Sequence, residues 1–142
     1  MIDEKDKQII DILLDSGRES SSSISEKLGI SVPTVIDRIK KLQESNVISG
    51  FKAIVDFKSI GLKVSALISI ISESSDNYTE IVKKSLETSE VLKCYATTGS
   101  GSHVLIVNTV DTDSLERLLR KIQSWPGVKR TETQIILSSH KT

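Results

Sequence analysis

Hydrophobic residues return at three- and four-residue steps through the first 45 positions of the chain, a spacing that indicates amphipathic helices. The first such segment starts behind Asp3, a good N-cap residue, and is expected to end at Gly17. Its apolar positions are Ile9, Ile10, Leu13 and Leu14. One face of this helix is therefore predicted to pack against its neighbours.

Two shorter helices are predicted to follow in quick succession. Ser20 is placed to cap the first and Gly29 to end it, while Ser31 is placed to cap the second. Pro33 stands near the start of that helix, where a missing N–H costs nothing. The apolar positions are Ile24 and Leu28 in one helix and Val35, Ile39 and Leu42 in the other. A tight glycine-containing turn between the last two of three helices is typical of the helix-turn-helix arrangement.

Apolar residues on both sides of Ser49-Gly50 predict a short β-ribbon, or wing, after the third helix. Its two strands would be Val47-Ile48 and Phe51 to Val55. Residues 1–55 are therefore interpreted as a helix-turn-helix DNA-binding domain with a short wing, and residues 56–62 as a linker.

From residue 63 onward the period of the pattern changes, and strands are predicted. Val64 to Ser72 is a nearly continuous apolar run, as expected for a strand covered on both faces. Val91 to Thr98 and Val104 to Val110 predict a hairpin around the loop Gly99 to His103. The last strand is expected over Val128 to Leu137.

Two helices are predicted between these strands. Asp76 is the expected cap of the first, with Tyr78, Ile81, Val82 and Leu86 inward. The second is expected behind Asp113 as cap, with Glu116 as third-position carboxylate, and Pro126-Gly127 ends it. Its apolar positions are Leu115, Leu118, Leu119 and Ile122.

The resulting order, βαββαβ over residues 63–142, predicts an α+β domain of the ferredoxin-like type, with an antiparallel sheet and both helices on one face. The other face of the sheet would stay apolar and uncovered. Because large exposed apolar patches mark interaction surfaces, we expect a second copy of the chain to cover it, which makes a homodimer.

Composition narrows the choice of partners. Acidic and basic side chains balance at 19 each, so no whole-chain positive field attracts nucleic acid, although Lys27 to Lys52 is locally positive. Cys94 is the only cysteine, which excludes an internal disulfide and a cysteine metal site. The N-terminus has no signal-peptide-like apolar stretch. We expect a soluble cytoplasmic protein with no cofactor, metal or membrane partner.

The third helix presents polar residues on the side away from its apolar stripe, where a recognition helix meets the major groove of double-stranded DNA. Arg38 is the best candidate for reading a base, because its guanidinium matches the two acceptors of guanine. Asp37 either accepts from cytosine or pairs with Lys41, and the alternative for the whole set is a solvated helix face. The candidate DNA-binding residues are Ser31, Pro33, Thr34, Asp37, Arg38, Lys40 and Lys41, with Lys27 and Lys52 beside them for phosphates.

Several segments carry a family resemblance, in a fixed order and spacing. They are Ile2 to Ile10, Asp15 to Arg18, Leu28 to Ser31, Arg38 to Leu42, Val47 to Phe51, Val91 to Tyr95, Thr97 to Gly99 and Trp125 to Thr133. From end to end the chain resembles the Lrp/AsnC, or feast/famine, transcription regulators. The resemblance implies a dimer, with tetramers and octamers as further assemblies, and an amino-acid effector held between dimers by the second domain.

The hairpin loop departs from the family pattern, which has two carboxylates where this chain has serines. Its candidate effector-binding residues are Gly99, Ser100, Gly101 and Ser102. A carboxylate is the natural partner of a ligand's ammonium group, so an amino-acid-like effector would be held more weakly here. A flexible hairpin loop is the alternative reading. Glu19, which stands where the family favours an apolar residue, and the serine run after it are expected to lower stability.

Three other functions are alternatives to sequence-specific transcription regulation. An enzyme lacks a paired set of groups, because nothing joins Cys94, His103 and His140. An RNA-recognition sheet needs aromatic residues, and Tyr95 is the only one on the two strands expected at the centre of the sheet. An architectural or effector-independent DNA-binding protein of the same fold stays open.

Overall fold

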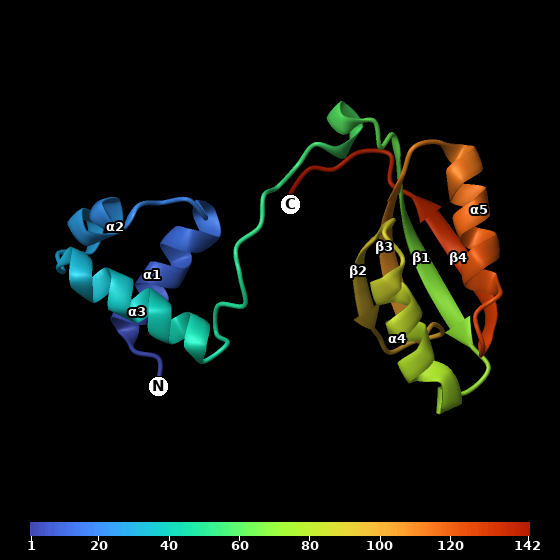
Figure 1. The fold of residues 1–142 in the computed structure, drawn as a ribbon, viewed down its shortest axis with the longest axis horizontal. Coiled ribbons are helices and arrows are strands. Elements are labelled where there is room, and N and C mark those ends of the chain that lie inside the picture. Colours follow the sequence, from blue (N-terminus) through green and yellow to red (C-terminus); the bar gives the residue numbers. More distant parts are fainter. The chain divides into compact units, whose positions relative to one another are not determined.

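The computed structural model describes all 142 residues, which form two compact units, Met1–Ile54 and Val55–Thr142 (Figure 1). Each unit has a hydrophobic core of its own. None of the helices has the length and apolar character that crossing a bilayer requires.

Three helices make the N-terminal unit: α1 (Glu4–Asp15), α2 (Ser21–Leu28) and α3 (Val32–Glu44). Each starts behind a residue whose side chain accepts a backbone N–H of the first turn, and these caps are Asp3, Ser20 and Ser31, as predicted. Gly29 ends α2 in the left-handed conformation, at φ 67°. The helix-turn-helix arrangement is confirmed.

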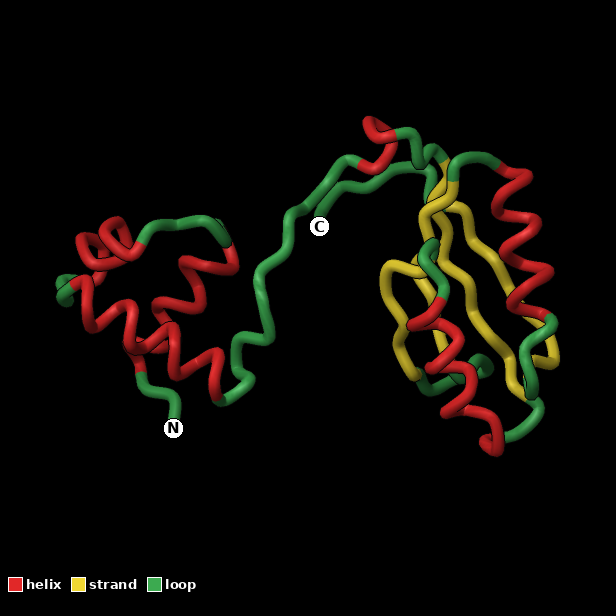
Figure 2. The backbone as a smooth tube through the Cα atoms, in the orientation of Figure 1, coloured by secondary structure: helices red, strands yellow, loops and turns green.

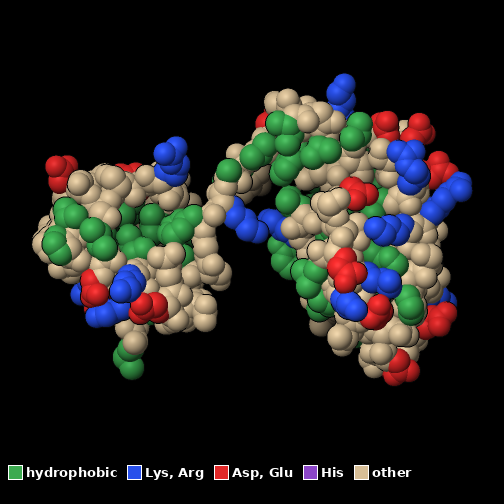
Figure 3. Space-filling view, in the orientation of Figure 1, with side chains coloured by type: hydrophobic (Ala, Val, Ile, Leu, Met, Phe, Trp, Pro, Cys, Tyr) green, Lys and Arg blue, Asp and Glu red, His purple; other side chains and the backbone are tan.

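The core of this unit is small. Ile9, Ile24 and Val35 are fully buried where the three helices meet. The apolar residues packed partly against them are Ile12, Leu13, Leu28, Ile30 and Ile39. On the face drawn in Figure 3, hydrophobic side chains of this unit gather between the helices, and charged side chains of both signs stand together at its edge. Leu14 was expected inward but is 80% exposed, so the buried face of α1 is narrower than predicted.

The segment after α3 forms no β-ribbon, so the predicted wing strands Val47-Ile48 and Phe51 to Val55 are wrong in detail. The N–H groups of Val47 and Ile48 both donate to the carbonyl oxygen of Leu42, which prolongs the end of α3. The following residues carry no strand pairing and are drawn as loop in Figure 2. An isolated two-stranded ribbon is only marginally stable unless it packs on a hydrophobic surface. Phe51 and Ile54 are exposed, so this segment lacks such packing.

The C-terminal unit contains one four-stranded antiparallel sheet in the order β2-β3-β1-β4. The strands are β1 (Val64–Ser72), β2 (Val91–Ala96), β3 (His103–Thr109) and β4 (Val128–Ile135). The helices are α4 (Tyr78–Glu87) and α5 (Thr112–Gln123), with short 3-10 turns η1 (Phe57–Ile60) and η2 (Ser75–Asn77). The βαββαβ order and the ferredoxin-like class are confirmed. β1 has the predicted bounds, whereas β2 and β4 stop two residues early and β3 is shifted by one.

The core of this unit lies between the sheet and the two helices. Strand residues Ala66, Ile68, Ile70, Leu105 and Val107 share it with helix residues Ile81, Leu115, Leu118 and Ile122, and with Trp125. Since these five strand residues all point to one face, α4 and α5 cover the same side of the sheet, as Figure 1 shows.

Both predicted helix caps in this unit are wrong. α5 starts behind Asp111, whose carboxylate accepts the N–H of Ser114 at 2.7 Å, and the expected cap Asp113 lies inside the first turn. α4 starts behind Asn77, because Asp76 belongs to η2. α4 is also turned differently from the expectation, since it buries Ile81 and Ser85 but leaves Val82 and Leu86 exposed.

The sheet face away from the helices has no covering layer within one chain. The strand register puts Leu67 beside Ile106 and Tyr95 beside Val104 on this face, all of them partly exposed, with Lys93, Arg130 and Glu132 toward the edges. The two central strands β1 and β3 contain no aromatic residue, and Tyr95 lies on the edge strand β2 instead. The centre of this face therefore carries aliphatic side chains and lacks the stacked aromatic residues that RNA recognition needs.

Candidate functional site

α3 is held by its cap and its core, and these fix which residues it presents to solvent. Ser31 accepts the N–H of Thr34 at 3.3 Å, and their two hydroxyls lie 2.7 Å apart. Val35 and Leu42 are buried, so the opposite side of the helix is exposed. It carries Pro33, Asp37, Lys40, Lys41 and Glu44, with half-buried Thr34 at its margin. Together with the cap Ser31, six of the seven residues predicted on α3 therefore lie on one solvent-facing surface. The seventh is Arg38.

The lysines on this surface pair only with carboxylates on their own helix. Lys41 Nζ lies 3.0 Å from Asp37 Oδ2, and Lys40 Nζ lies 4.0 Å from Glu44 Oε1. Both lysine side chains are 72% exposed, and exposed pairs of this kind contribute little stability. Both ammonium groups are therefore available to an external phosphate. Asp37 is engaged in the ion pair that was one of its two predicted roles.

Arg38 lies outside this surface, on the side of α3 that faces α1. Its Nη1 donates to Asp3 Oδ2 at 2.7 Å, to Asp3 Oδ1 at 2.8 Å and to Asp6 Oδ1 at 3.0 Å. Its side chain is 28% exposed, and its Nε is buried without a partner. Arg38 is therefore a clamp between the start of α1 and the middle of α3, which conflicts with the expectation that it reads guanine.

The clamp is electrostatically reinforced. The hydrogen bond from Arg38, followed by the backbone N–H of Asp6, lowers the pKa of Asp3 below its ordinary value. Asp3, and then Asp6, raise the pKa of Arg38 in turn. Asp3 accepts from the N–H of Asp6 while Asp6 accepts from that of Asp3, so the same carboxylates also form the capping box of α1. Sequence reasoning missed this contact because its partners are 32 and 35 residues from Arg38.

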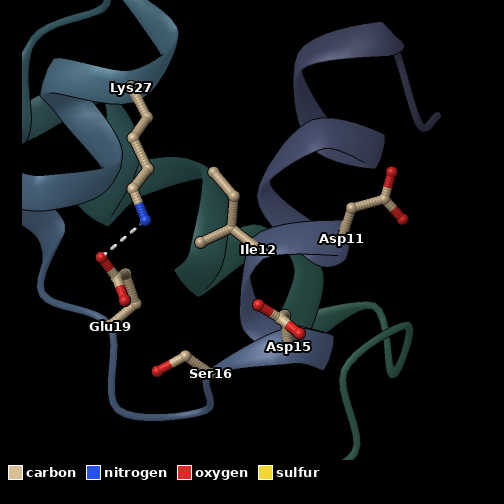
Figure 4. A pocket seen from close by; sticks show the side chains of 6 residues that line it. All are labelled: Asp11, Ile12, Asp15, Ser16, Glu19 and Lys27. Carbon is tan, nitrogen blue, oxygen red and sulfur yellow. Dashed lines mark hydrogen bonds and ion pairs between the residues drawn. The ribbon is translucent and has the colours of Figure 1, made fainter.

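Lys27 is directed into its own unit. Its Nζ lies 2.9 Å from Glu19 Oε1 at the edge of a hollow of about 250 Å³ lined by Asp11, Ile12, Asp15, Ser16, Glu19 and Lys27 (Figure 4). Hydrogen bonds from Ser23 Oγ and then Lys27 lower the pKa of Glu19. Glu19 thus bonds to the start of α2 and pairs with Lys27, one of the lysines predicted to neutralise a phosphate. Lys52 is exposed in the segment after α3.

The hairpin loop between β2 and β3 holds the predicted effector residues, and they face different ways. Ser100 is exposed at the tip, next to Gly99 in the left-handed region at φ 100°. Gly101 packs so closely that an added Cβ would lie 3.2 Å from the carbonyl oxygen of Ile70. Ser102 is buried. Only the outer part of this loop is open to a ligand within one chain.

Ser102 belongs to a buried polar network. Its Oγ lies 2.5 Å from Ser72 Oγ and 2.8 Å from Nδ1 of His103, and its N–H donates to Ile70 at 2.8 Å. His103 was expected at a solvent-facing or ligand-adjacent loop tip, but it is buried at the start of β3 with the ring of Tyr78 edge-on against it. Burial lowers the pKa of His103 below its ordinary value, which favours the neutral form of the ring.

One exposed apolar residue of α3, Ile36, was not among the predicted site residues. Ile36 follows Val35 directly and is 54% exposed on the flank of the helix away from Arg38. The available signal was its register, because position 36 breaks the apolar spacing of Val35, Ile39 and Leu42.

Comparison with known proteins matches the two units of the chain to two different family models. A family model described as the Lrp/AsnC ligand binding domain matches residues 63–142. A model described as a winged helix-turn-helix DNA-binding domain matches residues 2–49.

Similar proteins cover almost the whole chain. The HTH-type transcriptional regulator FL11 of Pyrococcus horikoshii is 36% identical over 140 residues, which are 99% of this chain and 92% of FL11. The regulatory protein AsnC of Escherichia coli is 30% identical over 140 residues, 98% of this chain and 92% of AsnC. The solved structure of E. coli AsnC has a TM-score of 0.85 at 29% identity and covers 100% of this chain and 96% of that one. The structure of B. subtilis LrpC has a TM-score of 0.85 at 26% identity, covering 100% and 99%. The chain therefore belongs to the Lrp/AsnC family and is a DNA-binding transcription regulator rather than an enzyme, with an N-terminal helix-turn-helix domain and a C-terminal ligand-binding domain.

Proposed function

We propose that the chain regulates transcription as a homodimer that presents two α3 helices to neighbouring major grooves of a pseudo-palindromic site. The observation that carries this proposal is the exposed polar face of α3, where Lys40 and Lys41 have only weak partners on their own helix. A helix of this kind enters the major groove with its N-terminal half toward the bases.

The proposed roles follow from where each side chain lies. Ser31 and the N–H of Val32 at the start of α3 meet a phosphate, and Pro33, Thr34 and Asp37 lie against base edges. Lys40, Lys41 and the exposed Lys52 neutralise phosphates, and Lys27 supports them only if its pair with Glu19 opens. Arg38 acts as a positioning residue that fixes the angle of α3 against α1.

The salt dependence of DNA binding tests the phosphate contacts. The slope of log affinity against log salt concentration falls by about 0.9 for each phosphate contact removed, so Lys40→Ala in a dimer should lower it by about 2. Lys83→Ala, which removes an exposed lysine from α4, is the control and should leave the slope unchanged. Equal slopes for wild type and the Lys40 variant would contradict the proposed face.

The uncovered sheet face is the proposed dimer interface. Leu67, Val104 and Ile106 form its apolar centre, and a second copy would bury this patch against an equivalent one. Leu67→Asp should give monomers by analytical ultracentrifugation and weaken DNA binding, since one α3 then reads one half-site. Leu86→Asp is the matched control, because Leu86 is equally apolar but lies exposed on α4, away from the sheet face. A Leu67→Asp protein that stays dimeric with unchanged Trp125 fluorescence would contradict this interface.

The loop Gly99 to Ser102 is proposed to border the site of an amino-acid-like effector at a subunit boundary. Its exposed tip at Ser100 supports this role. A ligand at a hundred times its dissociation constant should stabilise the protein by roughly 2.7 kcal/mol, which thermal-shift screening of amino acids detects. Ser100→Ala should weaken that shift.

Effector-independent DNA binding is the second candidate function. It is favoured by Ser102, whose hydroxyl is already engaged by Ser72 and His103 and is not free for a ligand. The absence of a shift across the amino acids, with DNA affinity unchanged by any of them, would select this candidate.

A further inference from the structure

Ile36 is an apolar residue at the edge of a helix face that is mostly polar. It is 54% exposed and is not among the residues packed on the core of the N-terminal unit. Of its four neighbours on the helix surface, Pro33 and Lys40 are exposed, whereas Val32 and Ile39 are half-buried. Pro33 and Ile36 thus form a short apolar strip beside the lysines.

The two flanks of α3 are occupied differently. Ile36 and Arg38 are two positions apart, which separates them by about 200° around the helix. The flank of Arg38 is filled by Asp3 and Asp6 of the α1 cap region. The flank of Ile36 carries no ion pair of this kind, and 54% of Ile36 stays exposed, so this side chain can contact whatever α3 docks against.

The chemistry of the major groove offers one apolar group at the base edges, the C5-methyl of thymine. An isoleucine suits that group, because its β-branched side chain has one strongly preferred rotamer in a helix and loses little freedom on contact. Ile36 also lies in the N-terminal half of α3, the half that approaches base edges in helix-turn-helix proteins.

We propose that Ile36 determines sequence specificity by packing on a thymine methyl group in each half-site. This inference rests on the proposed function, in which α3 enters the major groove. Ile36 therefore selects thymine at one position by apolar contact, while the lysines bind irrespective of sequence.

Removing the methyl group alone provides the test. A duplex selected from a random pool by the wild-type protein is remade with deoxyuridine in place of thymine, one symmetric pair of positions at a time. At one pair, wild-type affinity should fall about fourfold per half-site, the equivalent of about 0.8 kcal/mol for one buried methyl group. Ile36→Ala should bind the thymine duplex more weakly and lose no further affinity at that pair.

Two variants serve as controls. Leu14→Ala truncates an 80% exposed apolar residue on α1 and should keep the full response to deoxyuridine. Ile36→Leu retains an apolar side chain and should recover part of the response. Alanine is a strong helix former, so Ile36→Ala is expected to keep the wild-type circular dichroism spectrum.

The outcomes separate this inference from the function it rests on. If the wild type binds the selected duplex, and Lys40→Ala lowers the salt slope, yet no thymine replacement weakens binding, the assignment of Ile36 is overturned alone. The same holds if Ile36→Ala keeps the full loss at every position. If the Lys40 variant leaves the slope unchanged, docking by α3 fails and the role of Ile36 fails with it.

Discussion

The two units of this chain reach a stable fold by different means. The N-terminal unit buries three apolar side chains completely, and it adds side-chain caps on all three helices and the ion pairs of Arg38 with Asp3 and Asp6. The C-terminal unit places ten buried residues between a four-stranded sheet and two helices. The domain that binds DNA thus adds caps and charge pairs to a small apolar core, and the domain proposed to carry assembly relies on a larger one.

Truncation of one core isoleucine should give the largest difference in stability between the two units. Ile24→Ala and Ile68→Ala each remove a fully buried side chain, at a cost of about 2 to 5 kcal/mol. The N-terminal core has three buried residues, so Ile24→Ala should unfold the N-terminal unit even without denaturant. The C-terminal core has ten, so Ile68→Ala should only lower the urea midpoint of the C-terminal unit.

The single tryptophan makes this result measurable. Trp125 is buried in the C-terminal unit, so its fluorescence follows that unit, while circular dichroism at 222 nm follows the helices of both. Ile24→Ala should reduce the dichroism and leave the fluorescence transition in place. A fluorescence midpoint that shifts as far for Ile24→Ala as for Ile68→Ala would mean that the two units unfold together.

A substitution that strains the backbone should have the next largest effect on the free energy of unfolding. Gly127 has φ 82°, and an added Cβ would lie 2.7 Å from the Cβ of Asn77, so Gly127→Ala should cost about 1 to 3 kcal/mol in the C-terminal unit. Gly50 is the matched control, because nothing lies within 4 Å of an added Cβ and its φ is not positive. Gly50→Ala should leave urea unfolding unchanged or slightly improve it. Equal losses of stability for the two variants would contradict the strain expected at Gly127.

Acid should affect the two units in different pH windows. The pKa of Asp3 is lowered from 3.8 and that of Glu19 from 4.5, so their contribution is complete above those values and is lost as the pH falls through the lower folded values. Burial lowers the pKa of His103 from 6.5, which means that the folded C-terminal unit also binds fewer protons than the unfolded one. The C-terminal unit should therefore weaken first, as the pH falls below about 6.5, and the N-terminal unit only below about 4.5.

Urea unfolding of Trp125 fluorescence at pH 7.5 and 5.5, at one protein concentration, measures the first window. The midpoint should be lower at pH 5.5 in the wild type and independent of pH in His103→Gln. A wild-type midpoint that rises on acidification would reverse the assigned direction.

Helix capping is the smallest effect. Ser20 accepts the N–H of Ser23, so Ser20→Ala should cost the N-terminal unit about 1 kcal/mol. Ser22→Ala makes the same substitution two residues later, inside α2, where alanine is the better helix former and a small gain is expected. Thermal unfolding followed at 222 nm compares the two, and losses of the same sign would argue against the cap.

What could be predicted from the sequence depended on how local each interaction is. The caps at Asp3, Ser20 and Ser31 and the bounds of β1 were predictable, because a cap acts over three residues and an apolar run shows its own ends. The caps of α4 and α5 were mistaken where several polar residues stand together, as Asp111 and Asp113 do.

The candidate site shows the same limit. The exposed face of α3 could be predicted, because the helical spacing of Val35 and Leu42 identifies the buried side. The clamp of Arg38 and the burial of His103 did not, since their partners lie more than 20 residues away along the chain or on another element of the fold. The wing was predicted from turn residues, but nothing in the unit covers its apolar side chains.

Hydroxyl-radical footprinting of the wild-type protein on its selected duplex tests the central claim most directly. A homodimer that reads DNA with two α3 helices should protect two symmetric stretches centred about one helical turn, or about 10 base pairs, apart. Protection of a single, asymmetric half-site by a monomer would contradict the account.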